Sequence, residues 1–337
     1  MIKYFKLLFK KHYIETILLV AALSLTYLLI VLNSTYSSYN YHPGAYNFPL
    51  SFLIVAICVL SFVFVFIRFS FLKNKKEIDL YYSLPIKRSH IILTQTLFGL
   101  VQLVGAYTIA YWVGFIVLLT RQNSFNLLPF LPFYFAFIPV IIVCFLSGIV
   151  IFLRANSVVD GILFVIMLIG LSYMLVLFIT IKNPTFNNKN NNLLYLLEIH
   201  LIPAGIYNYF YTSINGLQLS QLIQKSEVGA VIGNIMLYAG GALGGYTATI
   251  LTVNNEKTEN IGRTSDFIIG YKALIPIYSL LIILLFNDLI ISLVVSILFS
   301  FVMYVIYRRS AKFKLADYIC IASSIILGII FVSISRR

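Results

Sequence analysis

Long apolar segments follow one another along almost the whole chain, and they limit its possible folds more than any other feature. Runs of about 20 residues with few charges recur, and each is long enough for a helix to cross the ~30 Å hydrocarbon core of a membrane. Only 10% of the 337 residues are charged, and the mean hydropathy is +0.96. A soluble domain carries roughly 25% charged residues. We therefore expect an all-α, polytopic integral membrane protein.

The apolar segments and the interruptions between them predict the order of the elements. Residues 1–13 carry lysines among apolar residues and form either an interfacial helix or the basic flank of the first span. Residues 182–229 contain an Asn-rich tract and are too interrupted to span, so we interpret them as an external re-entrant or interfacial segment. The predicted spans are residues 14–32, 50–67, 91–119, 130–153, 161–181, 230–251, 268–286 and 290–307, and residues 315–334 are a candidate ninth span.

The distribution of basic residues predicts the orientation. With the N-terminus in the cytosol, 18 of the 24 Lys and Arg residues fall in cytosolic segments and four in external ones. Cytosolic loops of membrane proteins carry such an excess. The net charge of +13 therefore reflects basic cytosolic segments and does not indicate nucleic-acid binding. We expect a multi-pass protein of the cell membrane with a cytosolic N-terminus, in contact with membrane lipid.

The chain contains no motif for an enzyme or an energy source of its own. We find no GxxxxGK(S/T), HExxH or GxSxG sequence and no aspartate-rich metal cluster. The three cysteines lie in apolar segments without CxxC spacing, so we expect neither a disulfide framework nor a metal site. Carboxylates lie near the predicted span ends, which argues against an ion-coupled carrier.

Two sets of small or neutral polar residues stand inside predicted spans. Gln95 and Gln102 are seven residues apart and share a helix face, where they either line a pathway or hydrogen-bond to a neighbouring helix. The second set has the GxxxG spacing, which allows helices to approach closely. It comprises Gly240, Gly241, Gly244 and Gly245.

A short charged segment, residues 73–88, separates the second and third predicted spans. It holds two of the 11 acidic residues, Glu77 and Asp79, and five of the basic ones. Residues 75–83 predict one to two helical turns, and Pro85 disfavours a helix at the residue before it. Cytosolic placement alone explains the basic residues but neither the acidic pair nor the apolar residues that follow.

The same segment resembles a known family. Glu77 followed by Ser83, Leu84, Pro85 and Ile86 and then Arg88 is similar to the E…SLP(I/V)xR pattern of ABC-2 type exporter permeases. In that family this segment is the coupling helix, which sits in a cleft of a separate ATP-binding subunit. The stretch with Lys257, Glu259 and Gly262 resembles, with looser spacing, a Gram-positive subgroup that includes permeases of antibiotic-responsive systems and of phenol-soluble modulin exporters.

The resemblance implies an architecture and partners. Residues 1–251 would form the N-terminal helix and a six-span core of the type V exporter kind, and residues 252–337 a cytosolic loop and two or three further spans. ATP and Mg would be bound by ABC ATPase subunits, and this chain would bind no cofactor. A second copy, or a related permease, would complete the pathway. The ATPase contacts would come from Glu77, Asp79, Tyr81, Tyr82, Ser83, Leu84, Pro85 and Arg88.

Two other classes remain open on the sequence. One is a membrane sensor or immunity protein that binds an antibiotic or a peptide with residues 33–48 or 182–229 and does not transport it. The other is an integral-membrane lipid-modifying enzyme, which the missing acid, metal and nucleophile groups disfavour.

Overall fold

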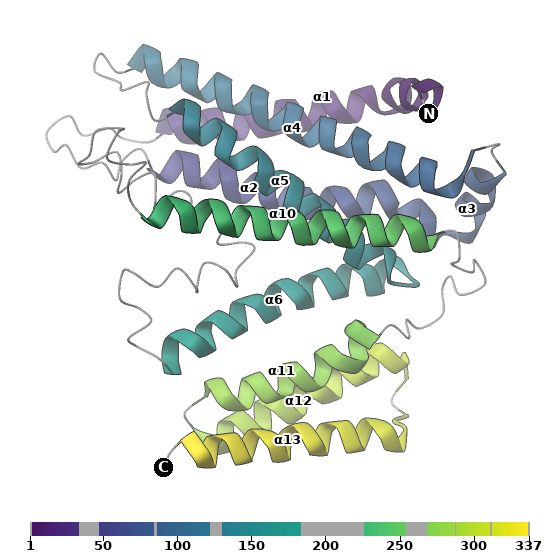
Figure 1. Cartoon of the computed structure of the whole chain (residues 1–337), viewed down its shortest axis with the longest axis vertical. Coiled ribbons are helices and arrows are strands. Elements are labelled where there is room, and N and C mark those ends of the chain that lie inside the picture. Colours follow the sequence, from purple (N-terminus) through teal and green to yellow (C-terminus); the bar gives the residue numbers. More distant parts are fainter. Residues whose placement is uncertain are drawn as a thin grey trace, which may run out of the picture. The chain divides into compact units, whose positions relative to one another are not determined.

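In the part of the chain that the computed structural model describes, the regular elements are helices, joined by short turns, and that part contains no strand. The described residues are 2–33, 47–83, 86–121, 130–182, 226–253, 268–286, 288–310 and 312–335. Each of the nine predicted apolar segments coincides with a helix, lies largely within one or contains one. Their bounds are α1 Ile2–Asn33, α2 Asn47–Phe69, α4 Arg88–Arg121, α5 Phe130–Leu153, α6 Val158–Lys182, α10 Ser226–Val253, α11 Ala273–Leu285, α12 Leu289–Arg308 and α13 Leu315–Ser335 (Figure 1).

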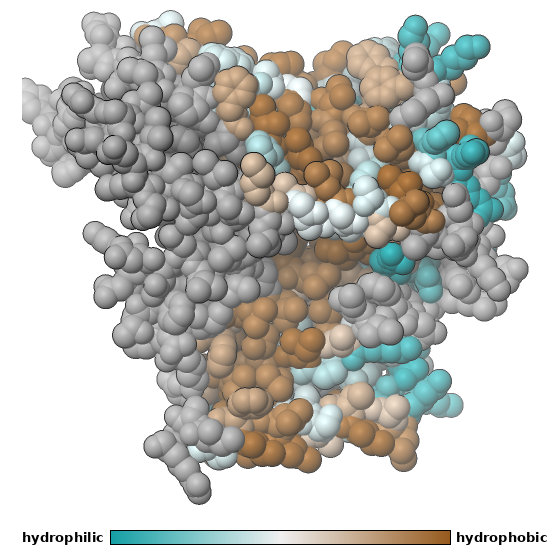
Figure 2. Space-filling view, viewed as in Figure 1, coloured by the Kyte–Doolittle hydropathy of each residue, from teal (hydrophilic) through white to brown (hydrophobic). Residues whose placement is uncertain are grey.

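Five helices are long and apolar enough to cross a membrane, among the residues described. Three shorter apolar helices, within α5, α6 and α11, accompany them. In the part of Figure 2 that holds α1, α2 and α4, hydrophobic residues lie along the helices and hydrophilic residues gather at the end where α3 lies. Large apolar side chains such as Leu29, Val55 and Leu298 are exposed on the outside, as expected of helices that face lipid. These features are compatible with a multi-pass membrane protein.

The helices group into two compact units. One comprises Met1–Phe71, Lys76–Val150 and His200–Glu256, and the other comprises Leu72–Lys75, Ile151–Ile199 and Lys257–Arg337. In this grouping α6 lies with the C-terminal helices. The hydroxyl of Tyr278 on α11, for example, donates to the backbone oxygen of Met167 on α6 at 2.6 Å.

In the first unit, α1 packs along α4, and α2 and α10 also contact α4. The interior is aromatic: Tyr27, Tyr107 and Tyr111 are almost fully buried. Tyr107 also stacks on Tyr134 of α5 with 5.7 Å between ring centroids. Gly114 of α4 lies directly against the Tyr27 ring, which leaves no space for a side chain at that position.

A kink divides α1. His12 has non-helical backbone angles (φ −114°, ψ 17°), and the turns before it are turned out of the line of the rest of the helix (Figure 1). The short N-terminal segment buries Tyr4 and Leu8 and exposes its four lysines. This separation from the span is the geometry expected of an interfacial helix.

The second unit contains α6, α11, α12 and α13 and a π-helical turn, η5, at Ile268–Lys272. Its core includes Phe164, Tyr271, Tyr304 and Tyr307. The hydroxyls of Ser279 and Ser324 join α11 and α13 at 2.7 Å, which satisfies two polar groups inside an apolar bundle.

Candidate functional site

A short helix lies in the connection between α2 and α4. A 3-10 turn, η2 (Ser70–Lys73), leads from α2 into the eight-residue helix α3 (Lys75–Tyr82). The amide of Ser83 closes its last turn by donating to the backbone oxygen of Asp79 at 3.0 Å. The new helix α4 then begins at Arg88. The predicted short helix in residues 75–83 is thus present.

The two faces of α3 differ in character. Ile78 is buried, while Glu77 and Asp79 are exposed. The Tyr81 ring packs on Phe71 with 4.3 Å between centroids, so part of its apolar surface serves internal packing. The helix therefore has a buried residue and an exposed surface that presents two carboxylates together with the ammonium groups of Lys75 and Lys76. Such an acidic pair suits a complementary basic protein surface.

The structure describes the other predicted ATPase-contact residues only in part. Ser83 is exposed and Arg88 is partly buried at the first position of α4. Tyr82 belongs to α3 by its backbone, whereas Leu84 and Pro85 lie outside the described residues.

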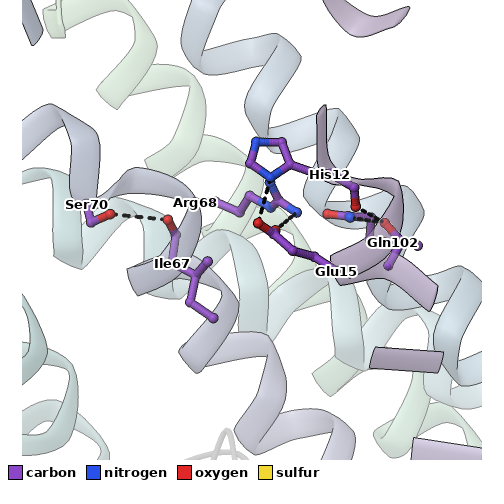
Figure 3. A network of polar contacts seen from close by, with 7 residues as sticks. His12, Glu15, Ile67, Arg68, Ser70 and Gln102 are labelled. Atoms are coloured by element: carbon purple, nitrogen blue, oxygen red, sulfur yellow. Dashed lines mark hydrogen bonds and ion pairs between the residues drawn. The ribbon is translucent and has the colours of Figure 1, made fainter. Parts of the chain in front are cut away.

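An ion pair fixes the end of α2 to α1 (Figure 3). Nη2 of Arg68 lies 3.2 Å from Oε2 of Glu15, and Nδ1 of His12 lies 2.9 Å from Oε1 of the same carboxylate. The Arg68 side chain is 2% exposed and that of Glu15 is 52% exposed. The guanidinium carbon also lies 4.9 Å from the Phe98 ring centroid on α4. This contact set joins three helices two residues before η2.

The two glutamines of α4 face α1. Gln95 donates from Nε2 to the Tyr4 hydroxyl at 3.1 Å. Nε2 of Gln102, which is labelled in Figure 3, donates to Oγ1 of Thr16. Both glutamine side chains are buried. Of the two interpretations of these residues, this geometry is that of hydrogen bonds between neighbouring helices within one chain.

The glycines of α10 differ from one another. A Cβ at Gly245 would lie 3.5 Å from Val150 of α5, so this glycine faces a neighbouring helix. At Gly240, Gly241 and Gly244 a Cβ would meet no described atom within 4 Å. Close helix packing at these three positions is therefore not seen within the described part of the chain.

A polar cluster in the second unit was not singled out from the sequence. Asp160, at the start of α6, accepts from the Tyr271 hydroxyl at 2.9 Å and lies 3.6 Å from Nη2 of Arg309. Arg308 makes a bidentate pair with Asp317, at 3.0 and 2.7 Å. The only sequence signal for these pairs is the position of each aspartate at a predicted span end.

The part of the chain that is described holds no group of three His, Cys, Asp or Glu side chains placed to bind a metal ion. Cys58, Cys144 and Cys320 are free thiols. The segments 34–46, 183–225 and 254–267, which include the predicted re-entrant region and Lys257, Glu259 and Gly262, lie outside the described residues. Comparison of the chain with models of protein families, with curated proteins and with solved structures finds no match in any of the three.

Proposed function

We propose that this chain is the membrane-spanning permease subunit of an ATP-driven ABC exporter in the cell membrane. The observation that supports this most is α3, a short helix between two long apolar helices that buries Ile78 and exposes Glu77 and Asp79. A loop whose only role is to keep basic residues in the cytosol does not need a buried side chain. A helix that receives a push from a partner needs both an anchor and an exposed recognition face.

In this proposal the ATP-binding subunits bind α3 from the cytosol, with the N-terminus of the chain on the same side. The acidic pair meets basic residues of the partner cleft, and the segment from Tyr81 to Arg88 supplies the remaining contact. ATP and Mg are bound by the partner. Movement of α3 is passed to α2 and α4, to which it is covalently joined.

The transported compounds are amphipathic or hydrophobic, for example peptides. The described helices carry mainly apolar and neutral polar side chains inside their spans, and charged groups collect near helix ends. Such walls suit molecules with large apolar surface better than ions or sugars. Two copies, or this chain with a related permease, would enclose the pathway.

The test is purification of the chain from its native membrane in mild detergent, with identification of the proteins that accompany it. We expect a stoichiometric P-loop ATPase. The double variant Glu77→Lys/Asp79→Lys should lose that subunit, because two like-charged contacts replace two complementary ones. The matched control is Asp288→Ser, which removes an exposed acidic residue but keeps a side chain able to cap α12 through the amide of Ile290.

If the double variant still retains the ATPase, the proposed contact between α3 and the ATPase is wrong. A chain that purifies alone, or with a kinase or a regulator only, would contradict the exporter and favour the sensor.

A further inference from the structure

A lysine two residues before α3 attaches the start of that helix to the end of α5 and the turn after it, which the sequence did not indicate. Lys73, the last residue of η2, donates from Nζ to the backbone oxygen of Leu153 at 2.8 Å and to that of Ala155. Its ammonium nitrogen also lies 5.9 Å from the centroid of the Phe152 ring. All four residues belong to the second unit.

The acceptors explain why a cation is placed there. Leu153 is the last residue of α5, and Ala155 is in the turn that leads to α6 at Val158. The final carbonyls of a helix have no partner within the helix, and the helix dipole makes this end negative. A lysine, with three N–H donors, can satisfy the helix-end oxygen of Leu153 and the oxygen of Ala155 in the following turn at once. Lys73 is thus a side-chain cap of α5 supplied from 80 residues earlier in the chain.

The position of this cap in the chain gives it a further consequence. α3 begins at Lys75, two residues after Lys73. The entry to α3 is therefore held to the turn between α5 and α6 by two hydrogen bonds, independently of the covalent connection to α2. A displacement of α3 that carries Lys73 with it must move that turn or break both bonds.

We propose that Lys73 is a positioning residue that transmits the movement of α3 to the α5–α6 turn. The inference rests on the proposed function, since it assumes that a partner moves α3. It adds a route that does not run through α2 or α4 and that reaches the start of α6.

The test is hydrogen–deuterium exchange of the complex with its ATPase subunit, without nucleotide and with ATP plus orthovanadate. In the wild-type complex we expect the nucleotide to change exchange both in α3 and in residues 151–158. In Lys73→Met, which keeps the side-chain length but has no donor, the change should persist in α3 and be lost in residues 151–158. Exchange of that turn without nucleotide should rise about tenfold, since charged hydrogen bonds are removed. Lys73→Arg should restore the response.

The control is Lys312→Met, which removes an exposed lysine elsewhere in the second unit. If Lys73→Met does not accumulate in the membrane, Lys73→Gln keeps an N–H donor without the charge and should show an intermediate response. An equal nucleotide response of the turn in Lys73→Met and wild type, or no response in wild type, would overturn the inference. Absence of any bound ATPase would instead contradict the proposed function.

Discussion

The guanidinium of Arg68 is buried, and the carboxylate that neutralises it, Oε2 of Glu15 at 3.2 Å, is half-exposed. Because the two side chains differ in exposure, their removal has different consequences. Loss of Glu15 leaves a buried cation without its counter-ion, whereas loss of Arg68 leaves a carboxylate that water can reach.

Glu15→Gln should therefore lower the free energy of unfolding by about 1–2 kcal/mol, a value reduced by the partial exposure of the carboxylate. Adding Arg68→Met should restore part of the loss, because the buried charge is then removed as well. Thermal unfolding in detergent measures both effects. Strictly additive losses in the double variant would contradict this account of the pair.

Gln102→Leu should change the free energy of unfolding by less than about 1 kcal/mol. The substitution removes the hydrogen bond to Thr16 but also removes a buried Oε1 that has no hydrogen-bond partner among the described residues. On the proposed function, export of a labelled amphipathic peptide should be unaffected, because the side chain faces α1. A changed substrate preference at unchanged stability would favour the pathway interpretation instead.

Two glycines of α4 provide a matched pair. Gly114→Ala should cost about 1–3 kcal/mol, because its Cβ would lie 2.6 Å from Cδ1 of the buried Tyr27 ring. Gly105→Ala should be neutral or stabilise by up to about 1 kcal/mol, since no described atom lies within 4 Å and alanine favours the helix. Unfolding midpoints of the two variants test the difference, and equal midpoints would contradict the packing of α1 on α4.

Arg308→Lys should lower the free energy of unfolding by about 2 kcal/mol although it keeps the charge. Lysine cannot reproduce the two parallel hydrogen bonds to the buried Asp317. The neighbouring variant Arg309→Lys should have a much smaller effect, because Arg309 is 48% exposed and 3.6 Å from its carboxylate partner. The ranking of the two midpoints is the measurement, and an equal loss would show that charge alone matters at both sites.

The helices could be predicted from the sequence because the information is local. The predicted fourth span, residues 130–153, has the bounds of α5, since an apolar run and its polar flanks are contiguous. The short helix before Pro85 follows equally from neighbouring residues. The number of helices that cross a membrane does not follow from the apolar runs alone, because α11 has 13 residues, fewer than the about 20 that a span needs.

The partners of polar residues could not be predicted in the same way. Glu15 and Arg68 are 53 residues apart, and Lys73 and Leu153 are 80 apart. Their pairing depends on which helices lie side by side, and apolar faces of similar composition do not encode that choice locally. The same reason explains why Gln95 and Gln102 left two interpretations open and why the face presented by Gly240 could not be assigned.

The length of α4 has a mechanical consequence. At 34 residues it measures about 50 Å, well beyond the ~30 Å hydrocarbon core. Arg88, the residue at which this helix begins, lies next to α3 in the chain. Rotation of such a rod by about 10° around that end displaces its far end by about 9 Å. On the proposed function, a small movement at α3 would therefore produce a larger movement at the other end of α4.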